Sequence, residues 1–402
     1  MERIRIADVA FGGDGVGRLA DGSVVFVPCT AVGDDVTIEV TERRQAFSRA
    51  TLVQLNEPGP GRCDPRCKHF GRCGGCAYQH LDYPTELAVK HRQFRALMAR
   101  LGKFTDFPDS EAFPAPNPYG YRNKLRLEPS ARRLEADGYH LDYGYCLRDN
   151  QTFFKLKECP LAQPELNALI PKAVRSDWGR QNARRPEPFT LTLRRDTTGT
   201  TAFYFGKASP KLPWLTERLL SHTYRVPTGS FWQVHPPVAE RLLATARDWL
   251  ADYPRTDALI DAYGGVGTFS IALGDDHPRR ILIESDPAAI EAADYNHRQA
   301  GLIADIIGAT TEEALPKALK SLRGQRATVV LDPPRTGCHP DVIAALRRHR
   351  VPLLLYVSCN AATLARDLHL LCADALYTPI RAALFDMFPR TAHFESAVLL
   401  KS

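Results

Sequence analysis

The chain of 402 residues is 44% hydrophobic and 24% charged, which is typical of a globular protein and excludes a disordered or collagen-like one. Its length suggests about two to four domains. No apolar run approaches the roughly 18 residues of a membrane span, and Met1-Glu2-Arg3 lacks the apolar core of a signal peptide. We therefore expect a cytoplasmic protein with no membrane partner.

Positive charge is concentrated in the amino-terminal half. Residues 1–225 hold 34 Lys and Arg against 26 Asp and Glu, whereas residues 226–402 hold 18 against 20. Bases beside aromatic rings suit phosphate contact and base stacking. The pattern favours a nucleic-acid partner, although a solvated face of mixed charge would have the same composition. The bases that stand close to Tyr119 and Tyr121 are Arg122, Lys124, Arg126, Arg132 and Arg133.

Residues 1–56 predict a small barrel. Short alternating segments at 23–27 and 35–40 are typical of strands, and Gly-Asp and Asp-Gly pairs separate such segments. The Pro- and Gly-rich stretch 57–61 then predicts a linker.

A second unit is predicted over residues 57–225. It begins with a cysteine-rich loop that reaches about residue 82, followed by a helix over 85–101 whose apolar residues share one face. This helix can pack on the third unit instead of its own. The remainder is mostly strand-like, at 124–127, 139–145, 189–193 and 201–205.

The third unit, residues 226–402, predicts a parallel sheet wound with helices. Apolar strands alternate along it with helical segments such as 287–300, which is the pattern of an α/β fold. The predicted strands are 258–260, 281–284, 327–330 and 353–357.

The cysteine-rich loop predicts a metal site. A disulfide framework does not suit a cytosolic chain of this size. Cys63, Cys67, Cys73 and Cys76 have spacings suited to a tetrahedral zinc ion. Alternatively, Cys67, Cys73, Cys76 and the distant Cys159, which precedes a proline, suit a [4Fe–4S] cluster. Spacing alone leaves both alternatives open.

The strands of the third unit end in chemically useful residues. Gly264-Gly265-Val266-Gly267 forms a turn with no bulky side chain in the way of a ligand. Glu284, 23 residues beyond Asp261, can accept hydrogen bonds from both hydroxyls of a ribose. These features fit NAD and S-adenosylmethionine equally. Asp332-Pro333-Pro334-Arg335 favours the methyl donor, because methyltransferases carry an acidic-Pro-Pro motif after the fourth strand.

Cys359 follows the strand at 353–357, at the edge where open α/β sheets bind their ligands. A lone cysteine would more often be a buried structural thiol. Here it accompanies a cofactor loop, an Asp-Pro-Pro motif and a late Glu395, and together these predict an enzyme site.

Nearly the whole chain resembles the RNA uracil-5 methyltransferase family. The stretch from Cys67 to Cys76 is similar to the iron–sulfur signature of its ribosomal members. Residues 1–56 resemble its TRAM domain, and Phe231-Trp232-Gln233-Val234 resembles a cofactor-contacting stretch. Ser358-Cys359-Asn360 and residues 386–395 are similar to its nucleophile and base motifs.

The resemblance implies a Rossmann-like class I methyltransferase domain at 226–402, a TRAM-type β-barrel at 1–56, and a mostly β central domain at 57–225 that carries an iron–sulfur loop. It implies that a monomer methylates uracil C5 in RNA, ribosomal RNA rather than tRNA. Two alternatives are a non-catalytic iron–sulfur RNA-binding protein and a methyltransferase that acts on another RNA position.

The resemblance also assigns roles to residues. Cys359 would be the nucleophile at C6 and Glu395 the base, while Asp332 would bind the uracil N3–H. Cys67, Cys73, Cys76 and Cys159 would ligate a [4Fe–4S] cluster, which leaves Cys63 spare. S-adenosylmethionine would contact Gln233, Tyr263, Gly265, Gly267, Thr268, Glu284, Thr310 and Asp332.

Three residues depart from the family pattern. Thr268 and His235 stand where Asn is usual, and Thr310 stands where Asp or Asn is common. These departures bear on the affinity for the methyl donor.

Overall fold

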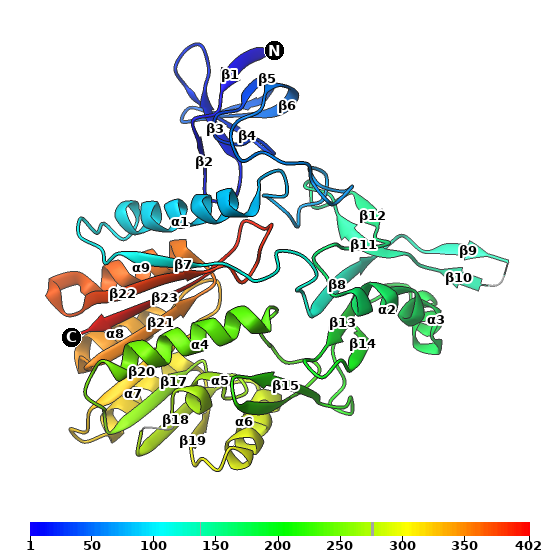
Figure 1. Ribbon diagram of the computed structural model, residues 1–402. Coiled ribbons are helices and arrows are strands. Elements are labelled where there is room, and N and C mark those ends of the chain that lie inside the picture. The colour runs from blue at the N-terminus through cyan, green and yellow to red at the C-terminus, as the bar shows by residue number, and fades with distance from the viewer. Residues whose placement is uncertain (137, 275–276) are drawn as a thin grey trace.

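The computed structural model describes residues 1–136, 138–274 and 277–402. Figure 1 shows a strand-rich part at the amino terminus, a large α/β part below it, and a second strand-rich part to one side. The order of these parts along the chain confirms the predicted α/β class with a small amino-terminal strand domain. Within the described residues, no helix combines the length and the apolar character needed to cross a membrane.

The amino-terminal part is one six-stranded sheet, in the order β1-β5-β6-β4-β3-β2. Alternate residues of its strands point into a common core, where Val25, Val27, Val36 and Ile38 are fully buried. The strands are β1 (Glu2–Arg5), β2 (Asp8–Val9), β3 (Gly15–Arg18), β4 (Val24–Val27), β5 (Asp35–Arg43) and β6 (Ser48–Glu57).

The central part is a five-stranded antiparallel sheet in the order β12-β11-β8-β13-β14. The hairpin of β9 and β10 extends from its outer end (Figure 1). The strands are β8 (Lys124–Pro129), β9 (Arg133–Glu135), β10 (Gly138–His140), β11 (Tyr143–Cys146), β12 (Phe153–Lys155), β13 (Leu191–Arg195) and β14 (Thr201–Phe205).

Two helices in this part were not predicted. α2 (Pro164–Arg175) packs on β13 and β14 through the buried Leu166, Ile170 and Ala173, and α3 (Asp177–Ala183) follows it. The apolar residues of these segments are spaced as in a helix, but Pro164 and Pro171 are more typical of loops, so the sequence did not predict the helices. The single strand expected over 139–145 is instead divided between β10 and β11.

The α/β part is built on an eight-stranded sheet in the order β19-β18-β17-β20-β21-β23-β22-β7. Strands β17 to β21 are parallel, and β23 lies antiparallel between β21 and β22. The strands are β7 (Ser110–Phe113), β17 (Ala258–Ala262), β18 (Arg279–Glu284), β19 (Asp305–Gly308), β20 (Ala327–Leu331), β21 (Leu353–Ser358), β22 (Thr378–Phe385) and β23 (Glu395–Lys401).

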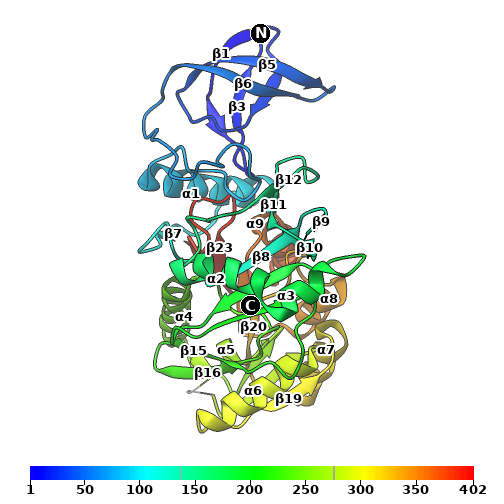
Figure 2. The same ribbon diagram turned by 90° about the vertical axis from the view of Figure 1, so that its right-hand side faces the viewer.

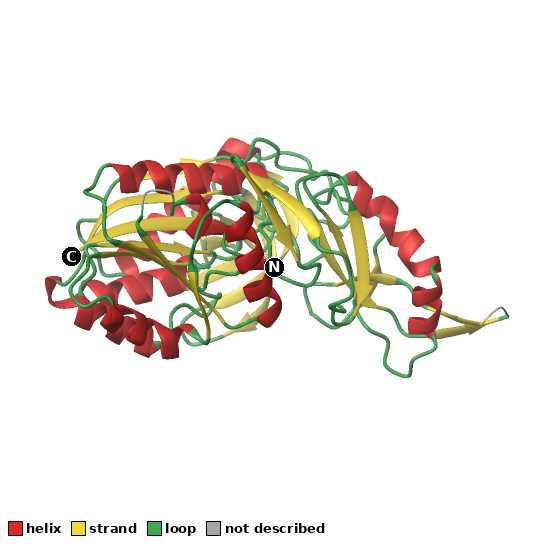
Figure 3. Ribbon diagram, turned by 90° about the horizontal axis from the view of Figure 1, so that it is seen from below, coloured by secondary structure: helices red, strands yellow, loops and turns green. Residues whose placement is uncertain are grey.

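Helices cover both faces of this sheet (Figure 3), so its central strands are buried on both sides and mostly apolar. A hairpin of β15 (Leu215–Leu219) and β16 (His222–Val226) packs against α4 and α6. The helices are α4 (Pro236–Ala251), α5 (Thr268–Ala272), α6 (Pro287–Gln299), α7 (Thr311–Ser321), α8 (Pro340–His349), α9 (Ala361–Cys372) and the short η1 (Ala373–Ala375).

Helix α1 (Tyr83–Arg100) lies between the amino-terminal sheet and the α/β part, as Figures 1 and 2 both show. Phe94 and Met98 enter the same core as Leu364 and Leu368 of α9. On its other side, Gln93 Nε2 donates to backbone carbonyls of the amino-terminal sheet. The helix therefore packs on the α/β part, although it precedes the central sheet in sequence. The domain boundaries at 56 and 225 stay predictions.

Candidate active site at the carboxyl edge of the sheet

The carboxyl ends of the parallel strands bring three predicted catalytic residues to one edge of the sheet. Asp332 directly follows β20, and Cys359 directly follows β21. Glu395 is the first residue of the antiparallel β23, which starts where β21 ends. The edge therefore gathers a thiol and two carboxyl groups from segments far apart in the sequence.

The two carboxyl groups are poorly solvated. Glu395 is 3% exposed, and burial raises its pKa well above the usual range, with a further increase from the charge of Asp332. Burial also raises the pKa of Asp332 to about 7, and the charge of Asp261 adds to this effect. Because low-dielectric surroundings and like charges both disfavour ionisation, this edge is suited to proton transfer near neutral pH.

Cys359 is partly buried beside these groups. Burial raises the pKa of its thiol to about 11, and the charges of Glu395 and Asp332 act in the same direction. Arg335 has the opposite effect through its charge and a hydrogen bond to the thiol. The Arg335 carbonyl oxygen in turn accepts a hydrogen bond from Asn360 Nδ2 at 3.0 Å. Sequence reasoning gave Arg335 no role of its own, although it directly follows the Asp-Pro-Pro motif.

The turn after β17 has an unusual backbone. Tyr263, Gly265 and Gly267 have φ angles of 69°, 54° and 90°, in the region that non-glycine residues rarely adopt. The Gly265 N–H donates to Glu284 Oε2 at 2.9 Å, which joins the turn to the end of β18. A Cβ atom on Gly265 would meet nothing within 4 Å, so the turn faces open space.

Two polar atoms at this edge lack a protein partner. Asp261 Oδ1 and Thr310 Oγ1 are buried and accept or donate no hydrogen bond within the described part of the chain. Thr310 precedes α7 without capping it through its side chain. An adenosine group carries hydroxyl and amine groups that satisfy such atoms, so the residues present fit the predicted cofactor.

The predicted residues Gln233 and Thr268 lie near the starts of α4 and α5, two helices that pack into one core. Gln233 lies in the segment before α4, where its carbonyl oxygen accepts a hydrogen bond from Asn123 Nδ2 at 2.9 Å. Thr268 opens α5. The neighbouring His235 is 2% exposed and stacks on Tyr121 with a centroid distance of 4.8 Å. His235, which stands where the family usually has Asn, therefore packs against Tyr121.

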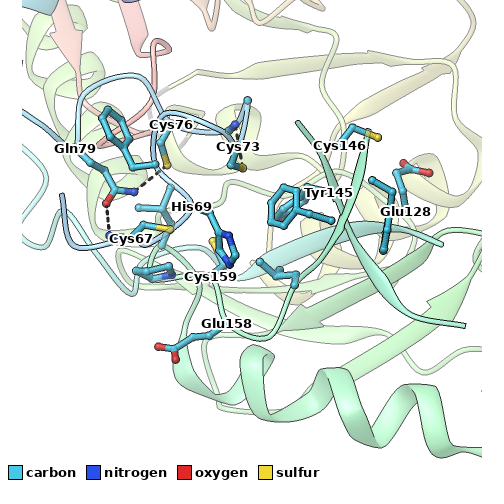
Figure 4. A pocket seen from close by; sticks show the side chains of 18 of the residues that line it. Cys67, His69, Cys73, Cys76, Gln79, Glu128, Tyr145, Cys146, Glu158 and Cys159 are labelled. Carbon is cyan, nitrogen blue, oxygen red and sulfur yellow. Dashed lines mark hydrogen bonds between the residues drawn. The ribbon is translucent and has the colours of Figure 1, made fainter. Parts of the chain in front are cut away.

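The four predicted cluster ligands surround one pocket of about 790 Å³. In Figure 4, Cys67, Cys73 and Cys76 of the cysteine-rich loop face Cys159. Two of the sulfur atoms accept hydrogen bonds: Cys73 Sγ from the Gly75 N–H at 3.4 Å and Cys76 Sγ from Gln79 Nε2 at 3.2 Å.

Over residues 1–136, 138–274 and 277–402, no three His, Cys, Asp or Glu side chains are gathered in a way that could hold a metal ion. Cys63 is exposed, and its Sγ donates to the Gln79 carbonyl oxygen at 3.6 Å. Sequence reasoning missed His69 and Cys146, which line the same pocket.

Comparison with known proteins supports the resemblance. The family model of tRNA (uracil-5-)-methyltransferase matches residues 216–402, and that of the TRAM domain matches residues 2–53. An uncharacterized RNA methyltransferase of Nostoc sp. is 32% identical over 99% of this chain and 95% of its own length. The 23S rRNA (uracil(1939)-C(5))-methyltransferase RlmD of Halomonas elongata is 30% identical over 98% of this chain and 88% of its own.

Among solved structures, the Pyrococcus abyssi tRNA (uracil-54, C5)-methyltransferase in complex with S-adenosyl-L-homocysteine has a similar fold. It aligns with 99% of this chain and 100% of its own, with a TM-score of 0.72 and 25% identity. Together with the relatives above, this likeness shows that the chain belongs to the tRNA (uracil-5-)-methyltransferase family of RNA methyltransferases and carries an amino-terminal TRAM domain.

Proposed function

We propose that this protein transfers a methyl group from S-adenosylmethionine to C5 of a uracil base in ribosomal RNA, through a covalent bond between Cys359 and C6. The observation that carries the proposal is the meeting of Cys359, Asp332 and Glu395 at the sheet edge beside the glycine turn. A thiol beside the buried carboxyl group of Glu395 and the partly buried one of Asp332 is the arrangement that this chemistry needs.

Cys359 begins the proposed reaction. Uracil C5 is a weak nucleophile, and covalent addition divides one difficult step into easier ones. The Cys359 thiolate forms a bond to C6, and the π electrons of the C5–C6 bond move toward C5 and the O4 carbonyl. Arg335 favours the thiolate because its positive charge lies near the sulfur. Asp332 accepts a hydrogen bond from the uracil N3–H, which cytosine lacks.

Glu395 completes the proposed reaction. When bound, S-adenosylmethionine supplies the methyl group as an electrophilic carbon on a sulfonium centre. Glu395 then removes the proton from C5, and the electrons of that C–H bond re-form the C5–C6 double bond as the C6–Sγ bond breaks. The raised pKa of Glu395 makes its carboxylate a stronger base than a solvated one. Cys359 leaves as a thiolate.

The donor would be held by residues that line the open turn. We propose that Glu284 binds the ribose hydroxyls and that Thr310 and Asp261 supply their unpartnered oxygen atoms to the adenosine. Gly265 and Gly267 would allow close approach of the ligand, and the cofactor-contacting set would be completed by Gln233, Tyr263, Thr268 and Asp332.

We propose that Cys67, Cys73, Cys76 and Cys159 ligate a [4Fe–4S] cluster. The four cysteines line one pocket, and four Cys thiolates are the usual ligands of such a cluster. The hydrogen bonds to Cys73 and Cys76 are of the kind that tune such clusters. When bound, the cluster would cross-link the cysteine-rich loop to the central sheet.

The proposed substrate is ribosomal RNA, because the relative from Halomonas elongata is named for a 23S rRNA uracil and shares 30% of its residues with this chain. The target base would leave its stack to reach Cys359. The cytoplasmic location expected from the sequence and the monomer implied by the family resemblance remain predictions.

Methyl transfer from labelled S-adenosylmethionine tests the function. Ribosomal RNA and tRNA from a strain without this protein are incubated with it, and modified uridines are mapped by mass spectrometry. We expect 5-methyluridine at one position of the ribosomal RNA. Label in tRNA alone would overturn the substrate, and label on another atom would overturn the reaction. No label in either would favour a non-catalytic RNA-binding protein.

A further inference from the structure

A buried group of charged side chains joins α1 to the segment that leads into Glu395. Lys90 Nζ donates to Glu86 Oε1 and to Asp386 Oδ1, each at 2.7 Å. Arg390 is the fourth member of the group, and its Nη1 atom lies 3.2 Å from Glu86 Oε2. We refer to Glu86, Lys90, Asp386 and Arg390 as the buried quartet.

The buried quartet is electrically neutral and shielded from water. The side chains of Glu86, Lys90 and Asp386 are 0% exposed, and that of Arg390 is 7% exposed. Withdrawing four charges from water costs free energy that apolar side chains of similar volume would not. Two of the four belong to α1, which precedes the segment 216–402 matched by the methyltransferase family model. This cost is hard to explain if α1 only fills space.

The loop 386–394 is held at Asp386, Phe388, Pro389 and Arg390 by this group and its neighbours. The last of these contacts is at Arg390, five residues before Glu395. The Tyr83 hydroxyl donates to Asp386 Oδ2 (2.9 Å), Lys90 Nζ to the Phe388 carbonyl oxygen (3.2 Å) and the Tyr121 hydroxyl to the Pro389 carbonyl oxygen (3.0 Å). The Arg390 N–H donates to Glu86 Oε1 (2.6 Å), and Arg390 Nη1 donates to the Leu81 carbonyl oxygen (2.7 Å).

We propose that Glu86 and Lys90 are positioning residues for Glu395, since they fix the loop 386–394 so that the carboxylate meets the C5 proton. The inference rests on the proposed function and adds to it a part of the chain outside the matched methyltransferase segment. Cys359 and Asp332 directly follow β21 and β20, whereas Glu395 is the first residue of β23 and directly follows the loop that the buried quartet holds. Loosening the quartet should therefore slow proton removal more than the attack on C6.

The test uses the double variant Glu86→Gln/Lys90→Met. It removes one charge of each sign, so the remaining Asp386 and Arg390 still balance. Lys90→Met alone would leave two buried carboxylates facing one cation and is expected to unfold. Arg95→Met is the matched control, because Arg95 lies on the same helix with a side chain that is 59% exposed.

Two rates are measured with the full-length protein. On 5-fluorouridine RNA, which cannot lose a proton from C5, the rate of covalent adduct formation reports the attack by Cys359. On ordinary RNA, the decay of the methylated adduct reports proton removal. For the double variant we expect near wild-type formation and decay slowed by about tenfold or more, since a misplacement of about 1 Å can cost about a hundredfold in rate. Arg95→Met should alter neither rate.

Equal losses in both rates, or no loss in either, would overturn the proposal. Should the melting temperature show that the double variant is unfolded, Tyr83→Phe decides the matter, because it removes only one hydrogen bond to Asp386 within this assembly and one from the Ala115 N–H. In Tyr83→Phe the methylated adduct on ordinary RNA should decay more slowly, while the adduct on 5-fluorouridine RNA should form at the wild-type rate. If the wild type forms no adduct on 5-fluorouridine RNA, it is the proposed function that fails.

Discussion

Ser358 and Ser396 are paired across β21 and β23, and Ser396 Oγ donates a hydrogen bond to the Ser358 carbonyl oxygen at 3.1 Å. Both serines are buried. Cys359 is the residue after Ser358, and Glu395 is the residue before Ser396, so both leave the same end of this strand pair. The sheet therefore brings the backbones of the proposed nucleophile and base to the same edge, and the loop 386–394 that leads into Glu395 is held in addition by the buried quartet.

A covalent adduct on 5-fluorouridine RNA is the first expected outcome. Fluorine at C5 prevents proton removal, so the bond between Cys359 and C6 persists and the complex resists denaturing electrophoresis. Cys359→Ala should form no adduct while still binding RNA. Cys372→Ala, a change to another partly buried thiol at the end of α9, should form the adduct as the wild type does. An adduct with Cys359→Ala would contradict the nucleophile assignment.

Glu395→Gln should accumulate the adduct on ordinary RNA. Methyl transfer precedes proton removal, so loss of the base leaves a methylated adduct that cannot eliminate the thiol. Mass spectrometry of the digested complex measures its amount. If the variant turns over at the wild-type rate without an adduct, another group is the base. His393 would be tested next by substitution with Ala, since burial lowers its pKa to about 4 and leaves it neutral at physiological pH.

The rate of adduct formation should rise with pH through the neutral and alkaline range. Only the thiolate attacks, and because the Cys359 pKa is raised to about 11, the thiolate fraction grows throughout this range. Arg335→Gln removes the nearby cation that lowers this pKa, so the rise should move to higher pH and the rate at pH 7.5 should fall. Arg348→Gln, on the exposed part of α8, serves as the control. An unchanged profile in Arg335→Gln would show that the guanidinium does not act on the thiol.

Much of this edge could be predicted because its residues follow apolar strands. Asp332 and Cys359 each come directly after an apolar run that is typical of a buried strand, and the ends of parallel strands meet at one edge of a sheet. The family resemblance then supplied roles that spacing alone left open. The α/β class and the family membership were confirmed on this basis.

The parts that escaped prediction depend on contacts between distant segments. Lys90 and Asp386 are 296 residues apart in sequence, and a lysine in an amphipathic helix is far more often exposed than buried. Similarly, β7 joins the edge of the sheet beside β22 although it precedes the central strands in sequence. Helices α2 and α3 were missed for a local reason, since proline and glycine within them suggest loops.

Gly265→Ala should weaken binding of S-adenosylhomocysteine by about tenfold or more. The new Cβ atom would enter the open space where the donor is proposed to lie, at a φ of 54° that also strains alanine. Gly301→Ala is a matched control, because Gly301 has a φ of 70° and equally open surroundings on the exposed turn after α6. Calorimetry measures both affinities. Equal affinities in the two variants would place the cofactor elsewhere.

The proposed [4Fe–4S] cluster should be visible in the colour and the iron content of the purified protein. Protein purified without oxygen should be brown and contain about four iron and about four sulfide per chain. Cys159→Ser should lose the colour and the iron, because Cys159 would be the ligand that ties the cysteine-rich loop to the central sheet. Cys63→Ser should keep both, since Cys63 is exposed and its Sγ donates a hydrogen bond to the Gln79 carbonyl oxygen rather than facing the pocket.

Loss of the cluster should affect stability and RNA binding more than the chemical step. Without the cross-link, the Cys159→Ser variant should melt at a lower temperature and bind RNA more weakly, because the loop and the central sheet would no longer be joined. The rate of adduct formation at saturating RNA should change little, since Cys359 and Asp332 are placed by the strands of the α/β sheet. A colourless wild type with one zinc per chain would contradict the cluster and favour the zinc site of Cys63, Cys67, Cys73 and Cys76 instead.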